Sequence, residues 1–584
     1  MCGIIGIVGI RPVADRLLES LKRLEYRGYD SAGIATLDAG RLDRRRAKGK
    51  IRALEERLAQ EPIGGSVGIG HTRWATHGVP AERNAHPHRA GRVAVVHNGI
   101  IENFAALKAG LVAAGHSFES ETDTEVIAHL LDEALESGAE PLAAFKATLD
   151  KLEGAYALAV LVEGRDALVM GARRGSPLVV GYGEGEMFIG SDALAVGPFT
   201  QSVAYLDEGD YVAIDHAGAQ VFDATGAAVR RARHQVAASA ALVEKGNYRH
   251  FMEKEIHEQP DAIQHTLSAY LDPVTGRASA PDGFDFAAIP RIQIVACGTA
   301  YFAGLTAKYL FERLAGLPVD VEIASEFRYR EPAVVPGTLA LAISQSGETA
   351  DTLAALRWCK AQGLPTAAVV NSHQSSMARE ADRMWPTHAG PEIGHARGRI
   401  DDAATARLVQ VLMEAPRLIA ETLQREDAIR ALSGDLSRAR DVLYLGRGPF
   451  YPIALEGALK LKELSYIHAE GYAAGELKHG PLALVDEHMP VVVIAPSGEL
   501  LEKTLSNLQE VAARGGSPII LITDEGGGAS AHAANKVVLV PPCDPIIAPM
   551  VYAVPIQLLA YHTAVQKGTD VDQPRNLAKS VTVE

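Results

Sequence analysis

Residues 292–298 read Ile292-Gln293-Ile294-Val295-Ala296-Cys297-Gly298, an apolar run that ends in a glycine turn before a helical pattern. Residues 441–448, Asp441-Val442-Leu443-Tyr444-Leu445-Gly446-Arg447-Gly448, repeat this arrangement. About 50 residues after each run, a second apolar run ends in Ser-Gly-Glu, at 346–348 and at 497–499. Strands that alternate with helices at this spacing predict two α/β domains with doubly wound parallel sheets. Ligands of such sheets bind beyond the carboxyl ends of the strands.

The segment Ser344-Gln345-Ser346-Gly347-Glu348-Thr349 lies between the second strand of the first copy and a helix expected to begin near Ala350. Hydroxyl groups and free backbone N–H groups at a helix N-terminus suit a phosphate monoester. A plain Ser/Thr N-cap is the alternative. The second copy has Ala495-Pro496 in place of Ser344-Gln345, so we expect phosphate in the first copy alone.

Acid–base side chains gather in the second copy. Glu456, Lys460 and Glu463 fall at positions i, i+4 and i+7 of a helix expected over 451–467, which places them on one face. Solvated ion pairs are the alternative interpretation. The turn that follows contains His479, whose side chain titrates near neutrality. We therefore expect proton-transfer chemistry in this copy.

The N-terminus, Met1-Cys2-Gly3-Ile4-Ile5-Gly6, carries a candidate nucleophile. Removal of Met1 is expected because a small residue follows it, and Cys2 would then hold both a thiol and a free α-amine. An α-amine has a reference pKa near 8, which suits a general base for the thiol. The apolar run that follows predicts a buried strand. The alternative is that Cys2 is a small buried apolar residue.

Three further features of the N-terminal part favour catalysis, and each has an ordinary alternative. The Asn98-Gly99 pair follows an apolar strand and can direct an amide and a backbone N–H at an oxyanion, although such a pair alone indicates a tight turn. Arg73 has the planar fork that binds a carboxylate or forms a surface salt bridge. Asp123 precedes a periodic helix and could be its N-cap. Five histidines lie between positions 71 and 97, without the spacing typical of a zinc site.

Five ordered motifs in this part resemble the N-terminal-nucleophile glutamine amidotransferase domain. They are residues 2–4, 26–33, 71–78, 97–99 and 121–125. The resemblance implies an α+β domain with four αββα layers, of the Ntn-hydrolase type. It implies that Cys2 attacks the glutamine side-chain amide while Asn98 and Gly99 hold the oxyanion. The residues that it assigns to glutamine binding are Arg73 on the α-carboxylate, Asp123 on the ammonium, and Trp74, Thr76 and His77 beside them.

Nearly the whole chain resembles the glutamine–fructose-6-phosphate aminotransferases (isomerizing), or glucosamine-6-phosphate synthases. The additional motifs are residues 297–299, 344–352, 451–463, 476–480 and the tail 572–584. The family implies L-glutamine and D-fructose 6-phosphate as substrates, two sugar-isomerase domains, a homodimer, and no metal or organic cofactor.

The family also implies roles in the sugar half. Lys579 would form a Schiff base with open-chain sugar, and His479 would assist ring opening. Glu463 would move a proton between C1 and C2, with Lys460 and Glu456 in support. The residues that would hold the sugar phosphate are Thr299, Ser344, Gln345, Ser346, Thr349 and Ala578. The alternative for Lys579 is an ordinary solvated lysine near a chain end.

The expected domains are a glutamine amidotransferase domain (2–218), a linker with a connecting helix (219–285), a first sugar-isomerase domain (286–425), a second (430–570) and a catalytic tail (571–584). The chain departs from the family at two places. Ala300 replaces a serine that many relatives have. After Gly394 the family continues with Val-Ala-Ser-Thr-Lys and a long apolar helix, of which about twenty residues are missing here. We expect the loss to leave an exposed apolar strip on the first sugar-isomerase domain.

The length, charge and composition of the chain argue against several classes of protein. The chain has 584 residues and a net charge of -15, which argues against nucleic-acid binding. No apolar run approaches the length of a membrane span, and the N-terminus does not fit a signal peptide. The four cysteines are too scattered for a disulfide framework. These features predict a protein of the cytoplasm.

The leading hypothesis is an enzyme that converts D-fructose 6-phosphate and L-glutamine to D-glucosamine 6-phosphate and L-glutamate, the first step of hexosamine synthesis. One alternative is a glutaminase whose synthase half is impaired by the gap after Gly394. A second is a sugar-phosphate-binding regulatory module with an inert N-terminal domain. The candidate side chains Cys2, Arg73, Asn98 and Asp123 argue against the second alternative.

Restoring the missing segment should raise synthase activity and melting temperature together. A helix of about twenty residues on a sheet buries apolar area worth ~12–20 kcal/mol, before the entropy of ordering it. We expect this result when the family's Val-Ala-Ser-Thr-Lys segment and helix are inserted after Gly394, with glutamine hydrolysis unchanged. Thermal melts and separate assays of glutamate and glucosamine 6-phosphate measure both effects. If the unmodified chain already equals a full-length relative, the helix is dispensable.

Overall fold

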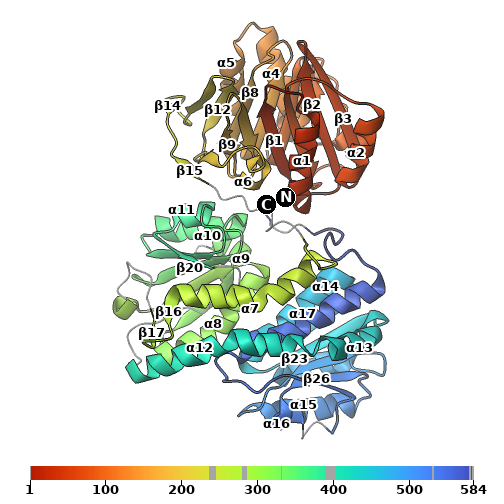
Figure 1. Cartoon of the computed structure of the whole chain (residues 1–584), viewed down its shortest axis with the longest axis vertical. Helices are drawn as coiled ribbons and strands as arrows, with labels where there is room; N and C mark the ends of the chain where they lie inside the picture. Colours follow the sequence, from red (N-terminus) through yellow and green to blue (C-terminus); the bar gives the residue numbers. More distant parts are fainter. Residues whose placement is uncertain are drawn as a thin grey trace. The chain divides into compact units, whose positions relative to one another are not determined.

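The computed structural model describes residues 2–235, 245–278, 286–330, 332–387, 402–528, 532–577 and 581. The chain divides into two compact units, Met1–Glu244 and Lys245–Leu577 (Figure 1). Ala578 and Lys579 lie outside the described residues, as does the segment around Gly394. In the described part, every helix is too short or too polar to cross a bilayer.

Two antiparallel sheets form the first unit. The eight-stranded sheet has, in spatial order, β15 (Arg233–Gln235), β11 (Ser202–Tyr205), β9 (Val179–Tyr182), β10 (Met187–Gly190), β1 (Gly3–Val8), β4 (Val67–Arg73), β2 (Ser31–Asp38) and β3 (Arg41–Lys48). The seven-stranded sheet has β14 (Ala228–Val229), β13 (Gly218–Phe222), β12 (Tyr211–Asp215), β8 (Val169–Arg174), β7 (Gly154–Val162), β6 (Val93–Ile101) and β5 (His88–Ala90).

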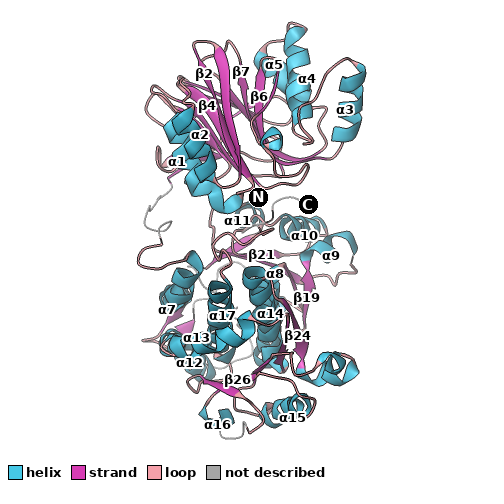
Figure 2. Ribbon diagram, turned by 90° about the vertical axis from the view of Figure 1, so that its right-hand side faces the viewer, coloured by secondary structure: helices cyan, strands magenta, loops and turns pink. Residues whose placement is uncertain are grey.

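Helices cover the outer face of each sheet, so the unit has four layers (Figure 2). On β1, Ile4 and Val8 pack between the two sheets, whereas Ile5 and Ile7 pack under helices on the other face. The helices over the eight-stranded sheet are α1 (Ala14–Leu24), α2 (Ile51–Gln60) and α6 (Ala193–Val196). Those over the seven-stranded sheet are α3 (Phe104–Ala113), α4 (Glu125–Glu136) and α5 (Pro141–Leu149). The predicted αββα layering is confirmed.

The first unit continues beyond residue 218, where the sequence placed the end of the amidotransferase domain. Strands β13, β14 and β15 pair within the two sheets of this unit. Residues 219–235 therefore belong to its sheets and not to a linker. The short, polar strands lack the apolar periodicity by which strands are predicted.

The second unit contains two parallel five-stranded sheets with the same strand order. The first sheet has β19 (Val319–Ile323), β18 (Ile292–Ala296), β20 (Leu339–Ser344), β21 (Thr366–Val370) and β22 (Arg383–Pro386). The second has β24 (His468–Ala473), β23 (Asp441–Gly446), β25 (Val491–Ile494), β26 (Ile519–Thr523) and β27 (Lys536–Leu539). The predicted repeat is confirmed. In both sheets the strand order reverses beside the first strand, where ligands of such folds bind.

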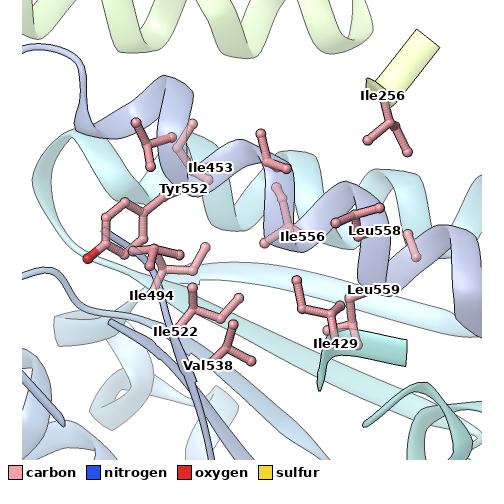
Figure 3. Packing of buried hydrophobic residues seen from close by; sticks show 14 of the residues in the cluster. Ile256, Ile429, Ile453, Ile494, Ile522, Val538, Tyr552, Ile556, Leu558 and Leu559 are labelled. Atoms are coloured by element: carbon pink, nitrogen blue, oxygen red, sulfur yellow. The ribbon is translucent and has the colours of Figure 1, made fainter. Parts of the chain in front are cut away.

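The longer helices of this unit pack together over the second sheet. They are α7 (Phe251–Tyr270), α12 (Asp402–Leu423), α13 (Glu426–Ser437), α14 (Tyr451–Ser465) and α17 (Ala548–Lys567). Figure 3 shows Ile556 and Leu559 of α17 above Ile522 and Val538 of the sheet, with Ile429 of α13 beside them.

In the described part of the first sheet, the apolar strip that we expected there is not exposed. Leu339, Leu341 and Val369 are only 1%, 3% and 6% exposed. They share a cluster with the aromatic side chains of Phe311 and Trp385, and Phe286 packs against it. The expectation was wrong because it left out these large aromatic groups, which also bury apolar surface.

Gly33 on β2 allows close packing in the first unit. A Cβ at this position would lie 2.2 Å from the His86 carbonyl oxygen, a backbone atom that cannot move aside. We expect Gly33→Ala to destabilise the first unit by ~2 kcal/mol and to lower its melting temperature by about 4–8 °C. Calorimetry of the full chain measures this shift. Gly110→Ala is the control, because Gly110 lies in α3 with open space around its Cβ position and should be neutral or stabilising. Equal melting temperatures for both variants would contradict the packing argument.

Candidate active sites

The first site surrounds Cys2, immediately before β1. Its sulfur accepts a hydrogen bond from the Trp74 N–H at 3.1 Å, and its carbonyl accepts one from Asn98 Nδ2 at 2.9 Å. Burial raises the pKa of the Cys2 thiol, while the terminal amine, the Trp74 N–H and Arg73 act in the opposite direction. The thiol therefore needs a base to become a nucleophile.

Asn98 and Gly99 lie within β6 and not at a turn, which corrects the sequence prediction. The ladder continues through both residues, with Asn98 opposite Ala157 and Gly99 opposite Tyr156. Gly99 has a φ of 137°, and a Cβ there would lie 1.9 Å from the Ala155 carbonyl oxygen. Only glycine fits this position. The strand directs the Asn98 amide toward Cys2.

Arg73 at the end of β4 is 3% exposed. Its Nη2 donates to the carbonyl oxygens of His77 and Gly78, while Nη1 is buried without a hydrogen-bond partner in the described structure. Burial lowers the pKa of Arg73, and nearby acidic groups, Asp123 among them, oppose that effect. A buried guanidinium nitrogen without an acceptor is suited to binding an anionic ligand group.

Asp123 is not the N-cap of α4, although the sequence allowed that interpretation. The N-cap is Thr124, and the Asp123 carboxylate instead accepts a hydrogen bond from the Ile101 N–H at 2.8 Å. His77 Nδ1 lies 3.9 Å from its other oxygen. Asp123 therefore connects the end of β6 to the 73–78 segment.

The remaining predicted glutamine-binding residues differ in their surroundings. The Trp74 ring meets the Tyr29 ring edge-on at 5.7 Å between centroids. Thr76 is exposed, and its hydroxyl lies 3.4 Å from His77 Nδ1. Asp30 was not singled out from the sequence, yet its carboxylate accepts from the Ala75 N–H at 2.8 Å. Because Asp30 lies in the 26–33 motif, that motif was the available signal.

Four of the five histidines between 71 and 97 are buried. Burial lowers the pKa of His71 to about 3, and it also lowers those of His86, His88 and His97. These rings are therefore neutral at physiological pH. Among the described residues, no group of three or more His, Cys, Asp or Glu is placed to hold a metal ion.

The second site lies on α14, at its contact with α8 (Gly298–Leu310). Lys460 Nζ lies 2.7 Å from Glu463 Oε2 and 3.7 Å from Glu456 Oε1. Thr299, at the start of α8, donates to Glu456 Oε1 at 3.1 Å. The predicted helical face is confirmed, and it joins residues of the two sugar-isomerase copies.

The pKa values of Glu456 and Lys460 are shifted within this charged group. Burial raises the pKa of Glu456, and its Oε2 has no hydrogen-bond partner in the described structure. Burial alone would lower the pKa of Lys460, but Glu456 and Glu463 together outweigh it, so that pKa is raised. Lys460 is therefore a cation between two carboxylates, and the solvated-pair interpretation does not hold for Glu456.

The predicted phosphate-binding loop connects β20 to α10 (Ala350–Ala361). The Gly347 N–H donates to Ser344 Oγ at 3.1 Å, and Thr349 Oγ1 lies 3.2 Å from the same oxygen. Thr349 is the N-cap residue, but its side chain makes no capping bond. The N-terminal N–H groups of α10 are thus not capped by that hydroxyl, as an anion site requires. Gln345 is exposed beside them.

The corresponding loop of the second copy is occupied by a carboxylate. Asp524, which follows β26, accepts from the Ser497 N–H at 3.0 Å, from the Ser497 hydroxyl and from the Gly527 N–H at 3.2 Å. The first copy has Asn371 at this position, after β21. Asp524 was missed from the sequence, although aligning the two copies would have shown the Asn-to-Asp difference. An internal carboxylate in this loop disfavours a bound phosphate.

His479 and the tail are not joined to the α14 group in the described structure. His479 ends a short 3₁₀ helix, 474–479, and is exposed. The start of the tail is held at two points. Asp572 accepts from the Phe251 N–H at 2.7 Å, and the Arg575 N–H donates to the Tyr466 hydroxyl at 2.7 Å. Tyr466 directly follows α14, so the tail begins beside the end of that helix.

Comparisons with known proteins give the same two kinds of domain, and the relatives match over the full chain. A model of the SIS domain matches residues 285–411 and 435–567, and a model of a glutamine amidotransferase domain matches residues 71–196. Glutamine–fructose-6-phosphate aminotransferases [isomerizing] of Caulobacter vibrioides and Brucella suis are 64% and 59% identical, each over 100% of both chains. The solved C-terminal domain of the glucosamine-fructose-6-phosphate aminotransferase from Francisella tularensis is 44% identical, with a TM-score of 0.53. It covers 56% of this chain and 100% of its own.

The relatives are longer than this chain. The alignment with the Caulobacter protein extends over 607 positions, 23 more than the 584 residues here. This difference agrees in size with the segment expected to be missing after Gly394.

Replacing Lys460 tests the buried charge group. In Lys460→Met, Glu456 loses its cation, so its folded-state pKa rises further above the unfolded value. The native state then binds a proton more readily than the unfolded state, so stability falls as pH rises through that folded pKa. We expect a loss of ~3 kcal/mol near pH 8 and a smaller loss near pH 5.5.

Urea titrations of the second unit's transition measure this loss. The control is Lys462→Met, an exposed position on the same helix, which should change stability by less than about 0.5 kcal/mol at either pH. A loss that does not depend on pH would show that Glu456 is not the group affected.

Proposed function

The chain belongs to the family of glutamine–fructose-6-phosphate aminotransferases (isomerizing), and on that premise we propose that it makes D-glucosamine 6-phosphate and L-glutamate from D-fructose 6-phosphate and L-glutamine. The observation that carries this proposal is the presence of two sets of polar groups in one chain. One is a thiol beside an amide and a buried guanidinium. The other is a carboxylate–ammonium–carboxylate group bonded by Thr299, in a unit that also contains a hydroxyl-rich loop.

In the first unit, the Cys2 thiolate would attack the glutamine side-chain amide after Met1 is removed. The developing oxyanion would be stabilised by Asn98 Nδ2 and the Gly99 N–H, which are neutral donors fixed on a strand. The unpaired Nη1 of Arg73 supports a role in binding the α-carboxylate. Asp123 would bind the ammonium group, with Trp74, Thr76 and His77 enclosing the substrate. Collapse of the tetrahedral adduct breaks the C–N bond, releases ammonia and leaves a thioester on Cys2. Water then hydrolyses the thioester to glutamate and the free thiol.

In the second unit, the phosphate would be bound by Ser344, Ser346, Thr349 and the N–H groups of α10, with Thr299 and Gln345 beside them. Ala578 would contribute through the tail. His479 would assist ring opening, and Lys579 would form a Schiff base at C2 of the open-chain ketose with loss of water. Ammonia would then displace the Lys579 amine from C2 and leave a sugar imine. Glu463 would remove the proton from C1 and return it to C2. Lys460 and Glu456 would support it, because Lys460 Nζ lies 2.7 Å from Glu463 Oε2 and holds that side chain in place.

The assembly and compartment are also proposed. We expect a homodimer in which His479, exposed in a single chain, serves the partner's sugar site. The four cysteines are free, and a nucleophilic thiol needs a reducing environment, which supports a cytoplasmic location. The proposed reaction draws on no metal or organic cofactor and no nucleic acid or membrane partner.

A second candidate function is glutamine hydrolysis with weak synthase output. The 23 extra positions in the relatives' alignment favour it, because a segment missing near a sugar site would reduce sugar-phosphate affinity. The amidotransferase site lies wholly in the other unit, and its side chains are all present.

Two variants separate the half-reactions. Cys2→Ala should lower glutamate and glucosamine 6-phosphate formation by at least about 10³-fold, because the nucleophile is lost. Lys579→Arg should abolish glucosamine 6-phosphate formation while glutamate release persists. Both products are assayed separately after incubation with glutamine and fructose 6-phosphate.

Cys359→Ala, which removes a buried thiol on α10, is the control and should retain both activities. Glutamate release by Cys2→Ala would contradict the proposed nucleophile, and glutamate without amino sugar in the unmodified chain would favour the second candidate.

A further inference from the structure

His71 lies beneath the Cys2 site, on β4 of the eight-stranded sheet, and reaches across to β6 of the other sheet. Its ring is fully buried. Its Nε2 lies 2.9 Å from the His97 carbonyl oxygen and 3.1 Å from Asn98 Oδ1. We propose that His71 is a positioning residue that holds the Asn98 amide with its nitrogen toward Cys2. This inference rests on the proposed oxyanion role of Asn98.

The hydrogen on the His71 ring is fixed by its neighbours. A backbone carbonyl can only accept a hydrogen bond, so the His71 nitrogen that faces the His97 oxygen must be the donor. Nε2 therefore carries the hydrogen and shares it between two acceptors. Nδ1 is buried without a partner in the described structure. Because burial holds the pKa of His71 at about 3, the ring stays a neutral donor over the physiological range.

The orientation of the Asn98 amide follows from that donor. The amide atom facing His71 Nε2–H must be the acceptor Oδ1, and the atom facing the Cys2 carbonyl oxygen must be the donor Nδ2. A flipped amide would put its NH₂ group against the His71 hydrogen and its oxygen against the Cys2 carbonyl. Two contacts, one from His71 on β4 and one from Cys2 just before β1, thus oppose the flip.

The orientation matters because the two ends of an amide have opposite effects on an oxyanion. Nδ2 stabilises a negative charge that develops beside Cys2, whereas Oδ1 in the same place would repel it. Loss of one oxyanion donor costs about 10²–10³-fold in kcat. Without His71, the Cys2 carbonyl alone would fix the orientation of the Asn98 amide, and that carbonyl moves with the nucleophile. His71 also ties the amide to β4, which ends in Arg73.

The experiment uses His71→Leu, which removes the donor, and His71→Gln, whose amide nitrogen can restore it. We expect His71→Leu to lower kcat for glutamine hydrolysis by about 10- to 100-fold, with KM changed less than about threefold, and His71→Gln to recover most of the loss. His88→Leu is the matched control, because His88 is equally buried and bonds Thr122 instead of Asn98. It should keep kcat within about threefold.

Two further readouts separate positioning from general disruption. Alkylation of Cys2 by iodoacetamide forms no oxyanion, so its rate should stay within about twofold in His71→Leu. In Asn98→Ala, adding His71→Leu should cause no further loss, since His71 acts through Asn98. Additive losses, slowed alkylation, or an equal loss in His88→Leu would overturn the inference. If Asn98→Ala itself hydrolyses glutamine normally, the proposed oxyanion role has failed instead.

Discussion

The register between β1 and β4 is the constraint on which the first site depends. Gly3 pairs with Thr72 and Ile4 with His71, so Cys2 comes beside Arg73 and Trp74. A slip of one residue would turn every side chain of β1 to the opposite face. It would also place a side chain where Gly3 now faces Leu24 and Thr72, only 2.7 Å from an added Cβ. The core on both faces of β1 therefore fixes the position of Cys2.

The second unit shows how one fold is used for two tasks. Both sheets have the same strand order, yet only the first keeps uncharged groups at the ends of its strands. In the second, Asp524 fills the loop around Ser497 from within. The side chains of Glu456, Lys460 and Glu463 lie instead on α14, the helix that follows the first strand of this copy, and Thr299 of the first copy bonds Glu456. If the two copies share one site, each copy must carry different side chains at equivalent positions, as the loops around Ser344 and Ser497 do.

Much of this arrangement could be predicted from sequence, because it depends on local spacing. The i, i+4, i+7 pattern gave the face of α14, and the repeated strand–glycine runs gave both parallel sheets. The sequence predictions failed where contacts between distant segments of the chain determine the local structure. Asn98-Gly99 reads as a turn, but β7 pairs with both residues and keeps them in a strand. The side-chain bonds of Asp123 and His71 join elements that only the fold brings together. Phe286, Phe311 and Trp385 bury a surface that a missing helix was expected to expose.

Charge is placed differently in the two sites, and the difference follows from their chemistry. Around Cys2, the donors nearest the proposed oxyanion are uncharged, and four neighbouring histidines are kept neutral by burial. A cation at those positions would stabilise the resting thiolate as well as the transition state, and so would bring less catalytic gain. On α14 the cation is permanent, because two carboxylates raise the pKa of Lys460 despite its burial. Lys460 Nζ lies 2.7 Å from Glu463 Oε2 and so holds that side chain on the same helical face. Hydroxyl and N–H donors would then bind the phosphate. Because these donors are neutral, they add no second cation that could pair with Glu463.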